Sequence, residues 1–515
     1  MFFFEKKNQK TFPRLRARGP GCERMKSFLL LFSSEKRRLL LASLSTVRRA
    51  WIPLLLVYFA YGALGLIDIS RDFWVKESLH LSPADLAALG VWLGLPWTIK
   101  MVFGQLVDSL PLLGSQRRSY LVLGAGLMAT GLVVLAGAAG GWLGFLPPAG
   151  LYVLGNLLLV LGTVLQDVVA DAMTTEVVDR TEPDGTPRDE TVVKAELGMV
   201  QLLGRMALSL GILSVAGLSG WLAMFLPRDT VFLIGLVIPA ITLLAALAAR
   251  DEARAVQAPD WRILGGGLAF GAAVVTLALV QVPFAQEVVF VLSMAVIIRM
   301  LVLVTRGLDA ATRHAILGTS IIIFAFRATP SAGDGAFWFT LDELGFDEAF
   351  LGHLRQTAAI LAIVGLWLLR HQLTKHSVAR VLFWLTLAGG VLSLPTIGLY
   401  YGIHHWTEAH LGFGARTIAL VDSAAGGPFA QLGMVPLLTL VAFYAPPAAR
   451  ATWFALMASL MNLALVAGSL QTKYLNMIFT VGRGDYGELG ALLITATLIG
   501  VALPLLALAI FRPRA

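Results

Sequence analysis

Apolar stretches of about 20 residues recur along this chain from Trp51 to its end, and few charged residues interrupt them. A stretch of that length is what an α-helix needs to cross the roughly 30 Å hydrocarbon core of a bilayer. Of the 515 residues, 57% are hydrophobic and 14% are charged, which excludes a water-soluble multidomain protein. The sequence therefore predicts an all-α polytopic membrane protein.

Hydropathy divides the chain into fourteen apolar segments. They are residues 51–70, 84–107, 119–140, 151–178, 192–225, 230–249, 263–282, 286–304, 314–341, 350–369, 378–401, 415–444, 451–470 and 489–511. Loops rich in Lys and Arg alternate with loops that nearly lack them, so the positive-inside rule places both termini in the cytoplasm. The cations that break this asymmetry are Arg71, Lys76, Arg228, Lys473 and Arg483.

Residues 1–50 form a basic extension. They hold 13 Lys and Arg against three Glu, a surplus of ten, so the remaining 465 residues carry 8 − 10 = −2 charges. The net positive charge of the chain therefore belongs to its N-terminal tail and does not indicate a nucleic-acid-binding surface. A cytoplasmic extension is expected, in a protein of the plasma (inner) membrane, while a targeting sequence for an organellar membrane stays an alternative. Met25 is an alternative start, and the only cysteine, Cys22, allows no disulfide framework.

A weak internal repeat pairs the first six segments with the last six. Phe73-Trp74 followed by residues 78–86 resembles Phe337-Trp338 followed by residues 343–351, and each pair closes a first helix and opens a second. The two-half plan that this spacing predicts is typical of secondary transporters. The expected parts are a tail at 1–50, six-helix halves at 51–250 and 314–515, and a linker with an extra hairpin at 251–313.

Two carboxylates lie in the fourth segment. Asp167 and Asp171 are four residues apart, so a helix places them one turn apart on one face. Asp167 is roughly 18 Å from the cytoplasmic end at about 1.5 Å per residue, near the middle of the bilayer. An ionisable group there costs at least about 2.5 kcal/mol and usually faces an interior or a water-filled path. We expect a proton-coupling site, and a buried ion pair that locks two helices is the structural alternative.

The same Asp-x-x-x-Asp pair also occurs in intramembrane prenyltransferases, whose carboxylates hold the magnesium of a diphosphate. That chemistry needs two such motifs facing each other at the membrane surface. This chain has one, and its first aspartate lies deep. The sequence therefore favours transport over an enzyme, with no catalytic residue, cofactor or metal site expected.

Two isolated arginines lie deep in apolar segments. Arg205 and Arg327 are each roughly 15 to 20 Å from the cytoplasmic end, and each presents a planar fork that suits a carboxylate. We expect Arg205, with Gln201 one turn earlier, either to bind an anionic solute or to neutralise the aspartates of the neighbouring segment. Arg327 is expected to bind solute too, with Asp334, seven residues on, as an alternative partner on its own helix face.

Further acids lie in equivalent helices of the two halves, which suits a central cavity. Asp68 and Asp334 are expected to join the proton-coupling groups, with a hydrated location near the extracellular end as the alternative. Asp422 is expected to bind solute, because the glycines and Pro428 that follow it favour an interrupted helix with polar backbone facing a cavity.

The junction between the second and third segments predicts a gate. Lys100 and Asp108 lie on roughly one helix face, and Asp108 is expected to pair with Arg117 and Arg118 when the cytoplasmic side is closed. The alternative is a static cap with arginines that only set orientation, and a Lys100 that extends to the interface.

Three runs of sequence carry a family resemblance. They are PWTIKMVFGQLVDSLPLLGSQRRSY at 96–120, QDVVADA at 166–172 and PPAARATWFALMASLMN at 446–462. They resemble the second-to-third helix junction, the fourth helix and the eleventh helix of the folate-biopterin transporter family, a branch of the major facilitator superfamily. The resemblance implies a major-facilitator-type bundle of two halves, here with twelve core helices and a central hairpin, and transport of folates, pterins or other metabolites.

The chain departs from the family at two places. Asp68, Arg71 and Asp72 stand where the family usually has small and apolar residues, and Arg450 stands where an acidic residue is common. Asn462, in the third run, is expected among the solute-binding residues. We therefore expect a monomeric secondary transporter, embedded in the lipid bilayer, for a small anionic solute of folate or pterin type. Proton symport is one hypothesis for its coupling, and an unrelated metabolite is the alternative cargo.

Overall fold

The computed structural model describes residues 49–179, 181–182, 186–249, 259–280, 282–306, 308–375, 377–443 and 450–511. The chain divides into two units, residues 1–52 and 53–515, and the second contains the helical bundle. The expectations for Met25, Cys22 and the rest of the tail up to residue 48 concern residues outside these ranges.

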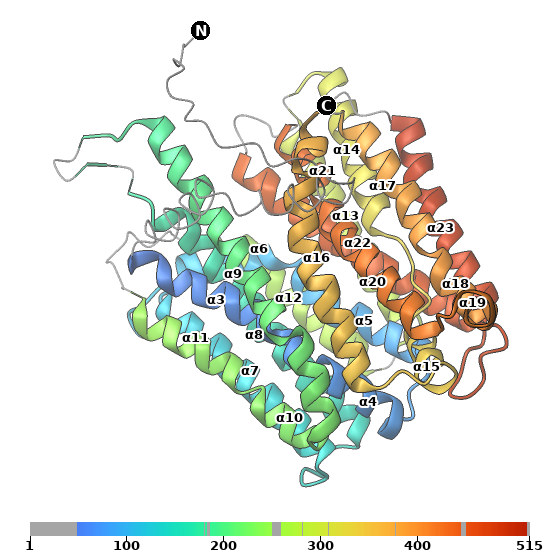
Figure 1. The fold of residues 1–515 in the computed structure, drawn as a ribbon. Helices are drawn as coiled ribbons and strands as arrows, with labels where there is room; N and C mark the ends of the chain where they lie inside the picture. The colour runs from blue at the N-terminus through green and yellow to red at the C-terminus, as the bar shows by residue number, and fades with distance from the viewer. Residues whose placement is uncertain are drawn as a thin grey trace, which may run out of the picture. The chain divides into compact units, whose positions relative to one another are not determined.

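The bundle is built from α-helices, and the described residues contain no β-strand (Figure 1). Up to residue 248 the elements are α3 (Ile52–Gly62), η3 (Ala63–Leu66), α4 (Asp68–Ser78), α5 (Pro83–Thr98), α6 (Lys100–Ser109), α7 (Arg118–Ala139), α8 (Pro148–Glu176), α9 (Glu190–Phe225), α10 (Arg228–Ile234) and α11 (Val237–Ala248). The following elements are α12 (Trp261–Leu279), α13 (Ala285–Val304), α14 (Ala310–Arg327), α15 (Asp334–Asp342), α16 (Glu348–Lys375), α17 (Val378–Leu392), α18 (Leu394–Tyr400), α19 (Ile403–Leu411), α20 (Ala415–Leu432), α21 (Met434–Phe443), α22 (Arg450–Ile478) and α23 (Leu489–Phe511).

Ten helical stretches within the described residues are long and apolar enough to cross a membrane. Helices also occupy the four remaining predicted segments, at 263–282, 314–341, 350–369 and 415–444, without satisfying both conditions. Two of these four segments are divided, into α14 with α15 and into α20 with α21. The count of fourteen spans stays a prediction.

Several helices break near their middle, where the local sequence cannot continue the hydrogen-bond ladder. α5 gives way to α6 at Ile99, three residues after Pro96, which has no N–H to donate and whose ring disturbs the preceding turn. α14 ends at Arg327, and the segment to Gly333 contains Pro330. Gly333 has φ of +73°, a backbone conformation that glycine adopts without strain. These breaks bring backbone groups and charged side chains into the interior.

We distinguish the two ends of the bundle by their loops. The basic end carries the junction of α6 with α7 and the start of α14, with Arg117, Arg118 and Arg313. The opposite end carries the loops that follow α4, α9 and α22, near Lys76, Arg228 and Arg483. In Figure 1 the basic end lies at the top and α10 lies at the bottom.

Two helix pairs join early and late parts of the chain. α5 packs along α22, and α9 packs along α16. Glycine makes both contacts close: a side chain at Gly94 would overlap Val466, and one at Gly220 would overlap the carbonyl oxygen of Glu348. Around them, apolar side chains such as Trp338 and Trp453 are fully buried.

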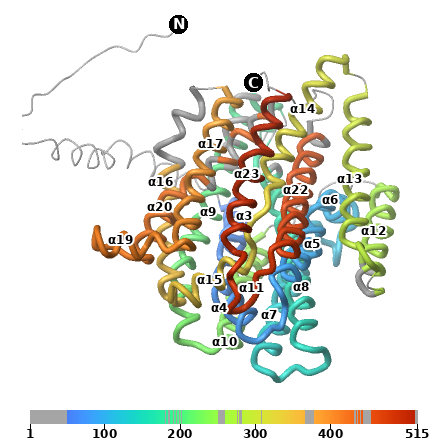
Figure 2. Tube along the Cα trace, turned by 90° about the vertical axis from the view of Figure 1, so that its right-hand side faces the viewer, coloured from blue at the N-terminus to red at the C-terminus, as the bar shows by residue number. Residues whose placement is uncertain are grey.

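The predicted hairpin of residues 251–313 contains α12 and α13. Figure 2 shows both at the side of the bundle, where α12 contacts α6 and α13 contacts α5 and α22. Neither helix contributes to the cavity described below. The division into two halves and a peripheral hairpin stays a prediction with which this placement agrees.

Candidate functional site

The two aspartates of α8 form a cluster with a lysine and a tyrosine. Asp167 and Asp171 face α6, and the Lys100 ammonium donates a hydrogen bond to a carboxylate oxygen of each. The Tyr58 hydroxyl of α3 donates to the second oxygen of Asp171 at 2.9 Å. One cation and one hydroxyl therefore serve two carboxylates that share a helix face.

The break between α5 and α6 positions this lysine. Lys100 is the first residue of α6, so it begins a new helix beside α8. The break also leaves the Trp97 carbonyl without a helical donor, and the Asn462 amide of α22 donates to it at 3.1 Å. The Trp97 ring stacks against Tyr61 of α3, with centroids 6.0 Å apart. Asn462, expected to bind solute, thus lies at the contact of α22 with α5.

Lys100 therefore belongs to the aspartate cluster. Lys100 lies on α6 with Asp108, as expected, but its ion pairs are with Asp167 and Asp171, and its role in a gate stays a prediction. Lys100, and not Arg205, makes the ion pairs with those aspartates. Arg205 has no ion pair with any residue in the described ranges, although its charge acts on Asp167 from a distance.

A cavity of about 610 Å³ lies between α9 and α16, with residues of α3, η3, α4 and α20 completing its wall. Its lining is largely apolar, and the charged side chains that reach it are Asp68, Arg205 and Arg355. The side chain of Gln201 lies outside the described part of the structure, so its expected place beside Arg205 is not tested.

Asp68 sits in a network that joins α4 to α16. Its carboxylate forms an ion pair with Arg71 at 2.9 Å and lies 3.5 Å from the Arg355 guanidinium. Arg355 also donates to Asp72 at 3.1 Å. Arg355 was missed from the sequence because it lies near the end of its apolar segment, where cations usually extend to the interface. Arg355 is the last charged residue before the apolar run from Ala358 to Leu369, and that position was the available signal.

Arg327 and Asp334 do not share a helix face. The chain leaves the helix after Arg327, and Asp334 begins the next one. Arg327 donates from Nε to the Met461 carbonyl of α22 at 3.2 Å, and the charge that acts on Asp334 is that of Arg71. The expectation of a seven-residue pair is therefore wrong, because it assumed an unbroken helix.

Asp422 lies on α20, within hydrogen-bonding reach of Thr396. Thr396 lines a second cavity of about 600 Å³ among α14, α17, α18, α20 and α23, together with the segment between α14 and α15. Asp422 is not among the residues that line either cavity. α20 continues through Pro428, so the expected interruption occurs later, at Gly433.

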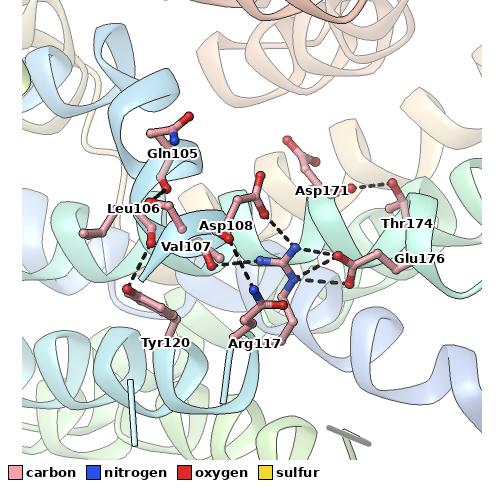
Figure 3. A network of polar contacts seen from close by, with 11 residues as sticks. Gln105, Leu106, Val107, Asp108, Arg117, Tyr120, Asp171, Thr174 and Glu176 are labelled. Carbon is pink, nitrogen blue, oxygen red and sulfur yellow. Dashed lines mark hydrogen bonds and ion pairs between the residues drawn. The ribbon is translucent and has the colours of Figure 1, made fainter. Parts of the chain in front are cut away.

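The expected pair of Asp108 with Arg117 is present at the basic end, where Figure 3 shows the Arg117 guanidinium between two acids, and its role as a gate stays a prediction. Arg117 pairs with Asp108 at 2.7 Å and also with Glu176 at the end of α8, and it donates to the Val107 carbonyl. Arg118 points to solvent, and its backbone N–H donates to Ser115. Glu176 is a partner that the sequence analysis did not identify.

The opposite end carries a second set of contacts, which we call the far latch: Lys76, Asp342, Tyr486 and Arg483. Asp342 of α15 accepts from Lys76 of α4 and from the Tyr486 hydroxyl. The Arg483 guanidinium donates to four carbonyls around the end of α4 and lies 4.3 Å from the centroid of the Trp338 ring.

Arg228 of α10 adds another link at this end by pairing with Glu77 of α4 and Glu348 of α16 at 3.1 Å each. All five cations that break the charge asymmetry therefore have partners. The remaining two are Arg71, described above, and Lys473, which pairs with Glu287 of α13 at 2.8 Å. Their positions on the side that otherwise avoids Lys and Arg were the sequence signal for these contacts.

Burial and hydrogen bonding act in opposite directions on Asp342. Burial alone would raise its pKa, yet the hydrogen bonds from Lys76 and Tyr486 lower the pKa below its ordinary value. Burial and the hydrogen bond to Asp342 together raise the pKa of Tyr486. Within the far latch, Asp342 is therefore an ionised carboxylate with one charged donor, Lys76, and one neutral donor, Tyr486.

Comparison with known proteins assigns the family. Residues 62–514 match the BT1 family. The "Folate-biopterin transporter" of Synechocystis sp. is 31% identical over 459 residues, which cover 88% of this chain and 80% of that protein. "Folate transporter 1" of Plasmodium falciparum is 20% identical, with 87% of this chain and 76% of that protein covered.

A solved structure has a similar fold. A POT family transporter in complex with 5-aminolevulinic acid superposes with a TM-score of 0.66 at 14% identity, over 90% of this chain and 96% of that one. This likeness confirms the major-facilitator-type fold expected from the sequence. The relatives are named as transporters and not as enzymes. The chain is therefore a membrane transporter that belongs to the BT1 family.

Proposed function

We propose that this transporter carries an anionic solute of folate or pterin type by alternating access. The observation that carries the proposal is Arg205, a guanidinium with no ion pair among the described residues, in a largely apolar cavity of about 610 Å³. Apolar walls suit a planar ring, and the unpaired fork suits a carboxylate. The names of the relatives support this solute class.

The packing of α9 on α16 supports alternating access. Near the opposite end the two helices touch, with Gly217 donating to Gln356 at 2.8 Å and Gly220 lying against Gly352. Towards the basic end the same helices line the cavity, with Arg205 on α9. The far latch and Arg228 hold the opposite end together. This arrangement fits a state that is closed at the opposite end and accessible from the basic end.

Asp167 and Asp171 are the proposed proton-coupling groups. One lysine serves both carboxylates, so protonating one leaves Lys100 to serve the other without stranding a charge. Asp68 and Asp334 are further candidates for the same role. Uptake into proteoliposomes should respond to an imposed pH gradient in the wild-type protein and lose that response in Asp167→Asn. Uptake that ignores the gradient in both proteins would remove proton symport from the proposal.

We also propose that the protein acts as a monomer in a plasma or inner membrane with both termini in the cytoplasm. The basic loops support this orientation. Cys22 is the only cysteine of the chain, so a membrane-impermeant maleimide should label it only after intact cells are permeabilised. Labelling of intact cells would reverse the orientation.

The solute proposal is tested at Arg205. Arg205→Lys keeps the charge and loses the planar fork, so folic acid uptake should fall much more than the amount of folded protein does. Arg313→Lys, at an exposed site near the basic end, is the matched control and should transport normally. Normal folic acid uptake by well-folded Arg205→Lys and Arg205→Gln would show that this arginine does not bind the solute.

A further inference from the structure

Arg355 is the second guanidinium of the cavity, and it stands beside a carboxylate that also lines it. The Arg355 and Asp68 side chains are 38% and 33% exposed and 3.5 Å apart. Together they present hydrogen-bond donors and acceptors side by side to the same space. Arg205 presents donors alone.

The Asp68 carboxylate keeps acceptor positions that its neighbours do not use. Arg71 pairs with Oδ1 of Asp68, while Oδ2 is the oxygen that lies near Arg355. The one hydrogen bond from Arg355 to an acid goes to Asp72, through Nη2. A carboxylate has about four acceptor positions and a guanidinium five N–H groups, so both retain capacity for a ligand.

The two charged points of the cavity are far apart along it. Gly217 of α9 bonds Gln356, so Arg355 lies near the level of Gly217. Arg205 is 217 − 205 = 12 residues earlier on α9, which at about 1.5 Å per residue is roughly 18 Å along the helix axis. The cavity thus has a donor-and-acceptor end at Asp68 and Arg355 and a donor-only end at Arg205.

We propose that the cavity binds an elongated solute of pteroylglutamate type at two points, with its ring at Asp68 and Arg355 and its carboxylates at Arg205. This inference rests on the proposed function and names the substrate class and orientation. The amino-keto edge of a pterin ring offers adjacent N–H donors to the Asp68 carboxylate and a carbonyl acceptor to Arg355. The glutamate end offers only anionic acceptors, which match the guanidinium of Arg205.

Three compounds distinguish binding at one end of the cavity from binding at the other. Folic acid has the ring and the carboxylates, biopterin has the ring without carboxylates, and p-aminobenzoylglutamate has the carboxylates without the ring. Asp68→Asn and Arg355→Gln should weaken binding of folic acid and biopterin about ten- to a hundredfold, the loss expected for hydrogen bonds to a charged group. They should leave p-aminobenzoylglutamate unaffected. Arg205→Gln should weaken folic acid and p-aminobenzoylglutamate and leave biopterin unaffected.

The measurement is equilibrium binding to the purified full-length protein. Asp68→Asn should fold, since Asp72 still pairs with Arg71 and Arg355. Asp229→Asn, in the first turn of α10, and Arg313→Gln are charge-matched controls away from the cavity. The inference is supported if Asp68→Asn and Arg355→Gln weaken only the compounds with a ring and Arg205→Gln weakens only those with carboxylates. Variants that weaken binding of all three compounds equally, or a reversed pattern, would overturn the proposed orientation of the solute. Neither result would contradict the proposed function as a folate transporter. Failure of the wild-type protein to bind any of the three overturns the proposed function and this inference together.

Discussion

Replacing Lys100 by Met tests which of the two aspartates depends on it. The lysine pairs with both, but the Asp167 side chain is 12% exposed and the Asp171 side chain 53%. Removing one partner of a buried pair costs about 3–5 kcal/mol, since the other charge stays uncompensated. An exposed pair contributes about 0–1 kcal/mol. Lys100→Met should therefore lower the free energy of unfolding by about 3–5 kcal/mol, and almost all of this loss should arise from the unpaired Asp167.

The hydroxyl of Tyr58 strengthens this asymmetry. It donates to Asp171 and remains there when the lysine is removed, whereas Asp167 has no such second donor within the described residues. Lys100→Met combined with Asp167→Asn should consequently recover most of the lost stability. The same change combined with Asp171→Asn should recover less than about 1 kcal/mol.

The assay is chemical unfolding of the purified protein in detergent at pH 8, with Lys100→Met and the two double variants measured side by side. Repeating it near pH 5 should reduce the penalty of Lys100→Met, because a stranded Asp167 then relieves its charge by binding a proton. Equal recovery by the two double variants, or better recovery with Asp171→Asn, would refute the reasoning from burial.

The remaining predictions concern the ends of the bundle. Asp342→Asn should destabilise the protein by a constant amount between pH 5 and 8 and by less in acid, as followed by thermal unfolding. The lowered pKa of Asp342 makes its contribution complete above the unfolded pKa of about 3.9 and lost as pH falls through the folded pKa. Gly220→Val should force α9 from α16 and increase maleimide labelling of a cysteine placed at the opposite end, whereas Gly126→Val, with open space around it, should not. Arg117→Gln should lower folded protein and uptake by leaving two acids unpaired, and the exposed Arg118→Gln should change neither in the same assays.

The fold was predictable because membrane helices are specified locally. Each span must bury its own backbone hydrogen bonds and meet lipid with apolar side chains, so hydropathy alone locates it. Asp167 and Asp171 were identified for the same reason, since an unbroken helix fixes their shared face. Arg205 was identified by its isolation in an apolar run, which needs no tertiary information.

Partner choice was less predictable because it depends on helix breaks. Lys100 and Asp108 do lie on one helix, but the break at Ile99 begins that helix beside α8, where Lys100 pairs with Asp167 and Asp171. The pairing of Arg327 with Asp334 requires a continuous helix, and the break after Arg327 separates them. Pro96 and Pro330 marked both places in the sequence. Hydropathy does not say in which direction the chain continues after a proline.

The contacts at these breaks suggest why the chain retains them. At the first break the Trp97 carbonyl receives the Asn462 amide of α22, and at the second the Ala328 carbonyl receives Gln471 of the same helix. α22 thus supplies donors to both interrupted helices, one early and one late in the chain. A movement of α22 relative to either helix would exchange these hydrogen bonds without breaking the ion pairs of Lys100 with Asp167 and Asp171, none of which lies on α22. We therefore expect rearrangements between transport states to be concentrated where α22 meets the breaks, while Lys100 stays with its aspartates.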